Sequence, residues 1–174
     1  PNRDHLLSVG YVPVDGTTIM LGGAAGFVVR TSREVGQSAT YHGLTDDIVA
    51  AGTALEEALP ATLRALTSRV LLAHFARIEV HFLSRACELL YGAPLVVPVV
   101  DTLEVQNRIV NPGFDDESKG NQLRLWNARR HYGLPRYSAH EALTDALACA
   151  ELYLAQVSEL ARTGPVTFNT LRTD

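Results

Sequence analysis

A long amphipathic pattern near the end of the 174-residue sequence most constrains how this chain can fold. Over residues 138–157 apolar side chains recur every three or four positions, the spacing of a helix that covers a core. Ser138 and Glu141 are predicted to form a capping box at the start of this helix. His140 and Asp145 lie in the same first part of the helix, where they are either solvated or members of a site. If the whole stretch is helical, these two side chains point about 140° apart, because a helix turns roughly 100° per residue.

Extended patterns fill the first part of the sequence. Three segments, separated by a hairpin signal and by glycines, are predicted to form an antiparallel meander: residues 5–14, 17–21 and 27–30. Later, short apolar runs at 70–73 and 95–100 are typical of buried strands, with helical patterns between and after them. This order predicts an α/β fold with a mixed sheet, antiparallel first and then parallel, with helices on both faces. We expect a single domain over residues 1–174.

The composition excludes several classes of function. A net charge of −4 argues against a broad electrostatic grip on duplex nucleic acid. No run of about 18 apolar residues occurs, so no transmembrane span and no membrane partner are expected. Cys87 and Cys149 have neither CxxC nor Cys/His spacing, which predicts buried thiols in a reducing compartment and a cytoplasmic protein.

The positive charges are unevenly spread, and five of the fifteen lie between residues 119 and 136. This basic segment contains one lysine and four arginines: Lys119, Arg124, Arg129, Arg130 and Arg136. Two interpretations remain open for it, a solvated helix face and a surface that contacts phosphates.

Polar residues also interrupt an otherwise largely apolar stretch, residues 71–83. His74 follows a predicted buried strand, the position at which open α/β sheets bind ligands. Glu79 lies at the edge of the apolar stripe of the next predicted helix. Because a buried carboxylate is costly unless it is paired or bound to a metal, Glu79 is either a ligand or a rim residue paired with Arg77 or Arg85.

Glu79, Asp145 and His140 together form a set with recognisable chemistry. Carboxylate oxygens are the ligands that Mg²⁺ takes in proteins, together with substrate phosphates. Two-metal phosphoryl transfer needs several acids that hold ions roughly 3.5–4 Å apart. It also needs a base that titrates near neutral pH, a task that suits a histidine.

Four short motifs resemble, in order and spacing, those of a known family. They are HGLT at 42–45, LAH at 72–74 with Glu79 and FL at 82–83, VDT at 100–102, and HEALTDA at 140–146. The family is that of the proofreading exonucleases typified by the epsilon subunit of bacterial replicative DNA polymerases. It forms the histidine-containing branch of the DEDD superfamily of 3′–5′ exonucleases, with a ribonuclease-H-like fold. The resemblance covers about residues 5–157.

The resemblance implies a role for each matching residue. His140 would be the general base on the attacking water, and Glu79 and Asp145 would be metal ligands. The substrate would be bordered by residues of the first two motifs: His42, Leu44, Thr45, His74 and Phe75. Asp101 is expected to cap a helix rather than to bind a metal.

The sequence departs from the family pattern at three points. Glu79 stands where the family has aspartate, and Phe75 stands where it has asparagine. The first acidic motif of the family, an Asp-x-Glu on the opening strand, is missing, since the Asp-x-Glu at 115–117 lies in a predicted loop far downstream. Its strand is therefore expected upstream of Pro1, which would leave the sheet of this chain without a central strand.

These features lead to one function hypothesis and one alternative. The hypothesis is a 3′–5′ exonuclease that acts on single-stranded 3′ ends of DNA or RNA and releases nucleoside 5′-monophosphates. It would use Mg²⁺ or Mn²⁺, with two ions when the upstream acidic motif is present, and could serve a polymerase or a larger multidomain chain. The alternative is a module that keeps the exonuclease fold for binding or regulation but has lost its activity.

Overall fold

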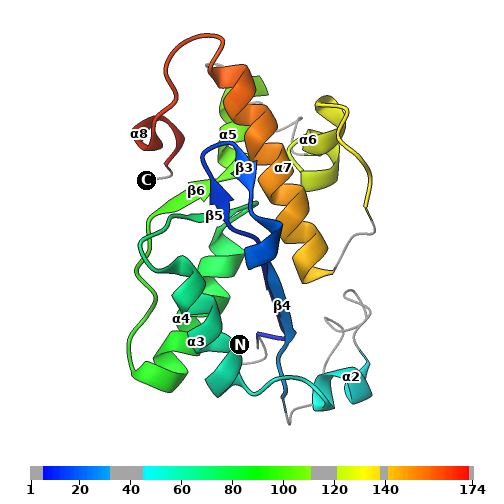
Figure 1. The fold of residues 1–174 in the computed structure, drawn as a ribbon, viewed down its shortest axis with the longest axis vertical. Helices are drawn as coiled ribbons and strands as arrows, with labels where there is room; N and C mark the ends of the chain where they lie inside the picture. Colours follow the sequence, from blue (N-terminus) through cyan, green and yellow to red (C-terminus); the bar gives the residue numbers. More distant parts are fainter. Residues whose placement is uncertain (1–5, 32–44, 111–120, 138–140, 173–174) are drawn as a thin grey trace.

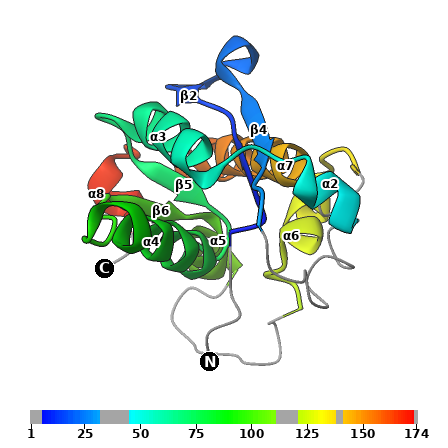
Figure 2. The same cartoon turned by 90° about the horizontal axis from the view of Figure 1, so that it is seen from below.

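A computed structural model describes residues 6–31, 45–110, 121–137 and 141–172. Short strands lie between two groups of helices (Figure 1). Figure 2 shows α3 (Leu55–Leu66) and α4 (Arg77–Tyr91) on one side of the strands, and α6 (Leu125–His131) and α7 (Ala142–Leu160) on the other. The predicted α/β fold with a mixed sheet and helices on both faces is therefore confirmed.

The antiparallel part is a β-hairpin in which each arm is divided into two short strands. β1 (Ser8–Tyr11) pairs with β4 (Ala25–Val28), and β2 (Val14–Asp15) pairs with β3 (Thr18–Ile19) nearer the turn. The antiparallel order agrees with the prediction, but the three-stranded meander does not. The glycine-containing segment Leu21–Gly23 forms a 3₁₀ turn within the returning arm and does not reverse the chain.

The parallel part consists of β5 (Leu71–Ala73) and β6 (Val99–Asp101), connected through α4. Ala73 and Asp101 are partners in the register, so the carboxyl ends of both strands meet at one edge. α5 (Thr102–Val110) begins immediately after β6. Side chains that follow these two strands are thereby placed side by side.

Among the described residues, no ladder joins the antiparallel pair β1–β4 to the parallel pair β5–β6. α7 packs on both β1 and β5 and so connects the two pairs. The contact with β1 is so close that a Cβ on Gly10 would lie 2.2 Å from the carbonyl carbon of Ala142. Only glycine can occupy position 10 without moving one of these two backbones.

The start of α7 differs from the prediction. The helix begins at Ala142, and Glu141 precedes it with extended backbone angles (φ −101°, ψ 122°). A capping box with Ser138 would require Glu141 inside the first turn, so that prediction is wrong. Ser138 and His140 lie outside the described residues. Because Asp145 is in the helix and His140 precedes it, the 140° separation expected for one continuous helix does not apply.

The remaining helices are short, and the core is divided in two. α2 (Asp46–Ala50) and α8 (Phe168–Leu171) have five and four residues. One core cluster includes Leu59, Leu83 and Cys87, and the other Val100, Val105 and Leu171. Cys87 and Cys149 are both buried free thiols, as predicted. Within the described ranges no helix is long and apolar enough to cross a membrane.

Candidate functional site

Asp101 organises the edge at which β5 and β6 end. Its Oδ1 accepts hydrogen bonds from the amides of Phe75 (2.8 Å) and Leu103 (2.9 Å), and its Oδ2 accepts one from the amide of Ala76 (2.8 Å). The residue is only 4% exposed. The expected helix cap is confirmed through Leu103, and the same carboxylate also fixes the loop after β5.

His74 lies beside Asp101, and its Nδ1 is 2.9 Å from the hydroxyl of Thr102. That hydroxyl also donates to the carbonyl of Ala73. Burial lowers the pKa of His74 below 6.5, against the opposing effects of the Asp101 charge and the Leu123 backbone. His74 is therefore mostly neutral at pH 7 and shapes the end of the strand without adding a positive charge.

Phe75 adopts an unusual backbone conformation with φ 67°. This left-handed region is strained for a bulky side chain and is more readily occupied by asparagine, the residue expected there from the family pattern. The two Asp101 hydrogen bonds to Phe75 and Ala76 hold the loop in place. Phe75 is 40% exposed, and the guanidinium carbon of Arg77 lies 5.7 Å from the centre of its ring. The loop thus presents an aromatic face to solvent beside the strand ends.

Glu79 lies in the first turn of α4, and its Oε2 atom is buried without a hydrogen-bond partner in the described part of the chain. Burial raises the pKa of its carboxyl to about 7, and the Asp101 charge contributes in the same direction. Arg85, one of the two expected partners, instead pairs with Glu88 at 3.1 Å. Glu79 is therefore not a rim residue paired with an arginine, and of the two interpretations the inward-facing carboxyl agrees with the structure.

Asp145 lies in the first turn of α7, where the positive end of the helix dipole favours a carboxylate. Its Oδ1 atom is buried. Cys149 follows one helical turn later, so the two side chains share a face of α7. The Cys149 sulfur is 3.6 Å from the Thr102 hydroxyl, and the Glu79 charge helps to raise the pKa of its thiol. This face of α7 is thus directed at the edge that carries Asp101 and Glu79.

The other candidate residues are only partly described. Thr45 caps α2, since its hydroxyl accepts a hydrogen bond from the amide of Ile48 at 3.4 Å. His42, Leu44 and His140 lie outside the described residues. The structure therefore brings His74, Phe75 and Glu79 together around Asp101 and directs the Asp145 face toward them.

Carboxylate oxygens of the kind that bind Mg²⁺ or Mn²⁺ are present in this group. The orphaned Oε2 of Glu79 is the kind of buried atom that a cation would satisfy. Nevertheless, the described residues contain no group of three or more His, Cys, Asp or Glu side chains arranged to hold a metal ion. The donor chemistry fits a divalent cation. The carboxylates of Glu79 and Asp145 would supply two ligands, and water and substrate would supply the others.

The basic segment includes one arginine that neither sequence interpretation anticipates. Arg129 is 1% exposed and donates to the Pro135 carbonyl (2.9 Å) and to Glu151 Oε2 (2.7 Å). Its guanidinium also lies 5.0 Å from the centre of the Tyr137 ring, and Tyr137 donates to the other Glu151 oxygen. Arg129 thus joins α6 to α7 and holds the segment that precedes His140 in sequence.

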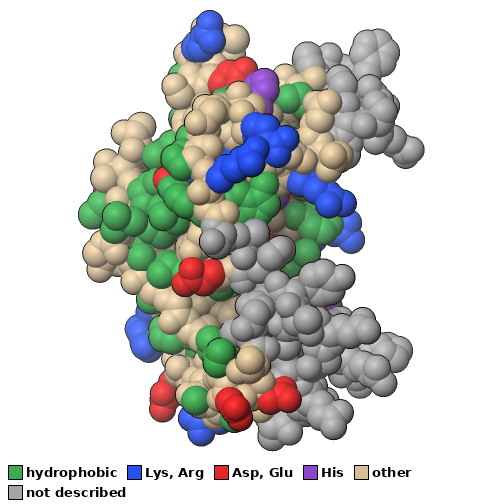
Figure 3. All heavy atoms as spheres, turned by 90° about the vertical axis from the view of Figure 1, so that its right-hand side faces the viewer, with side chains coloured by type: hydrophobic (Ala, Val, Ile, Leu, Met, Phe, Trp, Pro, Cys, Tyr) green, Lys and Arg blue, Asp and Glu red, His purple; other side chains and the backbone are tan. Residues whose placement is uncertain are grey.

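The other described arginines of the segment, Arg124, Arg130 and Arg136, are exposed. Figure 3 shows several basic side chains in the upper half of the right-hand side of Figure 1, and most of the acidic side chains toward its lower end, where a few basic ones also lie. Both interpretations of the basic segment remain open for these three residues.

Glu79 is expected to make the stability of the protein depend on pH in metal-free solution with EDTA. The folded state holds the Glu79 proton with a pKa of about 7, against 4.5 when the chain is unfolded. Between these values the folded state binds more protons, so the free energy of unfolding falls as pH rises, by up to about 3 kcal/mol. Urea unfolding of wild type and Glu79→Gln across this range measures the effect. The wild-type minus variant difference should decline with pH, and a constant or rising difference would contradict the assignment.

Three features of this arrangement were not predicted from the sequence: the hydrogen bonds of Asp101 to the loop after β5, the contact of Thr102 with Cys149, and the burial of Arg129. The contacts of Asp101 with the loop after β5 and the contact between Thr102 and Cys149 each join residues more than 20 positions apart. The Asp-Thr pair at the end of an apolar strand was the available signal for the first two residues. No local signal distinguishes Arg129 from the exposed Arg130 beside it.

The chain is similar to several known proteins. The family model RNase T, described as exonuclease, matches residues 1–153. The DNA polymerase III subunit epsilon-like protein of Rhodobacter capsulatus is 27% identical over 172 residues, which are 98% of this chain and 24% of that protein. The DNA polymerase III subunit epsilon of Treponema pallidum is 31% identical over 119 residues, which are 68% of this chain and 53% of the relative. The chain therefore spans about a quarter of the first relative and about half of the second.

The fold is also similar to that of a solved structure. Exonuclease X in complex with 5′ overhanging duplex DNA matches with a TM-score of 0.70 at 18% identity, over 97% of this chain and 90% of the other. This likeness agrees with the ribonuclease-H-like fold of such exonucleases. Because the family model matches most of the length of this chain, the chain belongs to the RNase T exonuclease family, among the DEDD exonucleases that resemble DNA polymerase III epsilon.

Proposed function

We propose that this chain is a metal-dependent 3′–5′ exonuclease that hydrolyses the terminal phosphodiester of single-stranded DNA and releases nucleoside 5′-monophosphates. The observation that carries the proposal is the inward-facing carboxyl of Glu79. It is buried beside Asp101, lacks a hydrogen-bond partner among the described residues, and has a pKa raised to about 7. A buried, perturbed acid in the helix that follows a parallel strand, close to the carboxyl end of that strand, is typical of a catalytic site.

Glu79 and Asp145 would hold the divalent cation. When bound, Mg²⁺ or Mn²⁺ neutralises charge on the scissile phosphate and favours deprotonation of water. The cation would also favour the ionised form of Glu79, because a nearby positive charge lowers a carboxyl pKa. This arrangement explains how an acidic protein could act on a polyanion, since the phosphate would meet the cation and not the bare carboxylates.

His140 would accept the proton of the attacking water. Its place in sequence, immediately before the N-cap residue Glu141, leaves it outside the helix that carries Asp145. Phe75 offers an exposed aromatic face on which a terminal base could stack, a contact of about 1–3 kcal/mol. His42, Leu44 and Thr45 would border the same nucleotide, and the neutral His74 would support the strand end beneath it.

The comparisons favour DNA as the substrate. The solved relative in fold is in complex with 5′ overhanging duplex DNA, and the relatives in sequence are named as DNA polymerase III subunits or as similar to them. We therefore also propose association with a replicative polymerase or with further domains of a longer chain.

Digestion of a single-stranded oligonucleotide that carries its label at the 5′ end tests the proposal. With Mg²⁺ or Mn²⁺, the label should appear in a ladder of progressively shorter products. His140→Ala and Asp145→Asn should each lower kcat/KM by about 100-fold or more, because each removes a group that acts on the reacting atoms. His81→Ala and Asp46→Asn are matched controls, since His81 and Asp46 are exposed on other helices. Immediate release of the label as a mononucleotide, or full activity of either site variant, would overturn the proposal.

A binding or regulatory module without activity is the second candidate. It is favoured by the absence of a three-donor metal group among the described residues and by Glu79, which stands where the family has aspartate. Calorimetric titration with Mn²⁺ separates the two candidates. Binding that Asp145→Asn abolishes supports the exonuclease, whereas no binding together with no digestion supports the module.

A further inference from the structure

A basic hollow lies at the opposite end of β5 from the candidate site. It is lined by Tyr11, Pro13, Gly23, Ala61, Arg64, Ala65 and Arg69 and has a volume of about 440 Å³. This volume is within the range of small-ligand sites, about 300–1,000 Å³. Arg69 precedes β5, whereas His74 follows it. Five residues of nearly extended chain separate the two positions by roughly 16 Å.

The two arginines are the charged groups among the described residues that line the hollow. Both are exposed, and neither guanidinium makes a hydrogen bond or ion pair within the described part of the chain. Arg129 and Arg85, by contrast, are paired with Glu151 and Glu88. In a chain with a net charge of −4, two unpaired cations without a lining carboxylate favour an anionic ligand.

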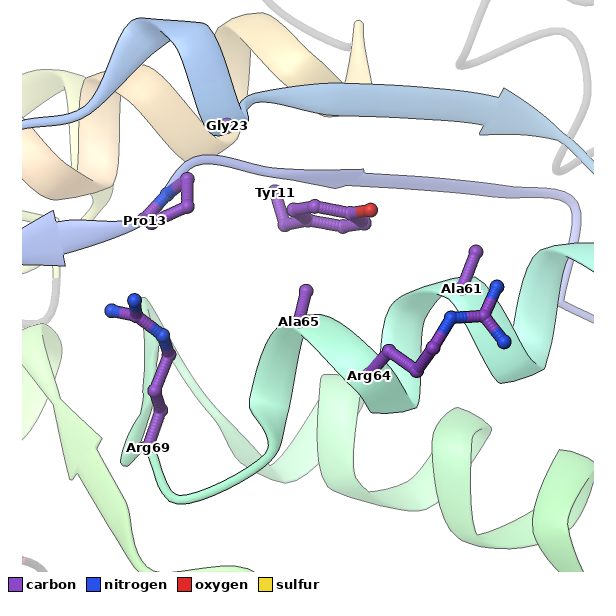
Figure 4. A pocket seen from close by; sticks show the side chains of 7 residues that line it. All are labelled: Tyr11, Pro13, Gly23, Ala61, Arg64, Ala65 and Arg69. Atoms are coloured by element: carbon purple, nitrogen blue, oxygen red, sulfur yellow. The ribbon is translucent and has the colours of Figure 1, made fainter.

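The side chains that line the hollow place an aromatic ring between the two arginines. Figure 4 shows Arg69 directed toward Pro13 and Arg64 extended beside Ala61, with the Tyr11 ring between them, opposite Ala65. Small side chains keep this space open, since Ala61 and Ala65 are one turn apart on α3. Arg69 follows Ser68, whose left-handed backbone (φ 58°) turns the chain out of α3. An aromatic ring between two guanidinium groups is a combination that binds single-stranded nucleic acid by stacking and phosphate contact.

We propose that the hollow binds backbone phosphates of the nucleic-acid strand at a distance from its 3′ end. The inference rests on the proposed function, because it takes the ligand to be the substrate strand. At 3.4 Å per stacked nucleotide, the roughly 16 Å straight line between the two places corresponds to at least about five nucleotides. A decanucleotide can therefore reach both places, whereas a dinucleotide at the candidate site cannot reach the hollow.

Fluorescence anisotropy with Mg²⁺ present tests the proposal without digestion, when the labelled dinucleotide and decanucleotide carry non-hydrolysable linkages and binding is measured over a series of salt concentrations. The variant is Arg64→Gln with Arg69→Gln. Its matched control is Arg85→Gln with Arg162→Gln, which removes the same charge from exposed positions outside the hollow. The hollow variant should bind the decanucleotide about tenfold more weakly, with a salt slope smaller by about 1.4, or 0.7 for each lost phosphate contact. Dinucleotide binding should equal that of the control.

A second variant keeps both arginines. Ala65→Glu places a carboxylate in the hollow and should weaken decanucleotide binding, while Ala65→Gln should do so much less, because it adds similar volume without charge.

Three outcomes would overturn the inference. One is an equal salt slope for the hollow variant and its control. Another is weaker dinucleotide binding by the hollow variant. The third is binding of thymidine monophosphate or inorganic phosphate that depends on the two arginines while decanucleotide binding is unchanged, which would indicate a small-anion site. Failure of the wild type to bind either oligonucleotide would instead count against the proposed function itself.

Discussion

Replacement of Asp101 by alanine is expected to lower the free energy of unfolding by about 3–5 kcal/mol. The substitution removes the acceptor of three amides, those of Phe75, Ala76 and Leu103, in a place that is 4% exposed. Each buried donor left without an acceptor costs about 1–3 kcal/mol, and the strained backbone of Phe75 loses its support as well. Urea unfolding followed by circular dichroism measures the change.

Two further variants make this expectation specific. Asp15→Ala removes an exposed carboxylate from the hairpin and should change stability by less than about 0.5 kcal/mol. Asp101→Asn retains one acceptor oxygen and removes the charge, so its effect on stability should be intermediate. It should also lower the pKa of Glu79 below about 7, although not to 4.5, because burial is the larger cause of that shift. An unchanged Glu79 titration in Asp101→Asn would show that the two groups are not coupled.

Replacement of Arg129 by alanine is expected to cost about 3–5 kcal/mol. Arg129 is 1% exposed and joins α6 to α7 through Glu151, the Ala148 carbonyl and the Pro135 carbonyl. The variant leaves these acceptors facing a cavity and removes the guanidinium from the Trp126 and Tyr137 rings. Thermal and urea unfolding of the variant give the magnitude.

The matched control for Arg129 is its neighbour. Arg130→Ala changes the same residue type at an exposed position and should shift stability by less than about 0.5 kcal/mol. Arg129→Lys should remain clearly destabilised, because an ammonium group cannot reproduce the fork that reaches Pro135, Ala148 and Glu151 together. Equal stability of the Arg129 and Arg130 variants would mean that the buried contacts contribute nothing net.

Several elements could be predicted because their signals are local. The parallel strands were expected from short apolar runs at 70–73 and 95–100; β5 lies within the first run, and β6 overlaps the end of the second. The helix of residues 76–90 follows from its apolar stripe and matches α4, Arg77–Tyr91, to within one residue. The Thr45 cap follows from a hydroxyl before two aspartates and was also found. In each case neighbours within one or two turns determine the conformation.

The errors occurred where distant contacts outweigh a local pattern. The capping box at Ser138 failed because α7 begins later, where Gly10 of β1 lies against Ala142. The three-stranded meander failed because the second glycine-containing segment makes a turn within one arm and reverses nothing. The burial of Arg129 was not predicted, because its carboxylate partner is 22 residues away in sequence.

The residue types of the site can be read from the sequence alone: an acid at the edge of the apolar stripe of α4, and a histidine and an acid five residues apart near the start of α7. Their order and spacing suffice to indicate the exonuclease family. Only the tertiary structure decided that α7 begins at Ala142, which separates Asp145 in the helix from His140 before it. It also decided that Asp101 fixes the loop of Phe75 and that Glu79 lacks an arginine partner. The reason is physical: a repeated apolar pattern encodes a helix over a few turns, whereas burial and the pKa of an acid depend on side chains brought together from distant parts of the chain.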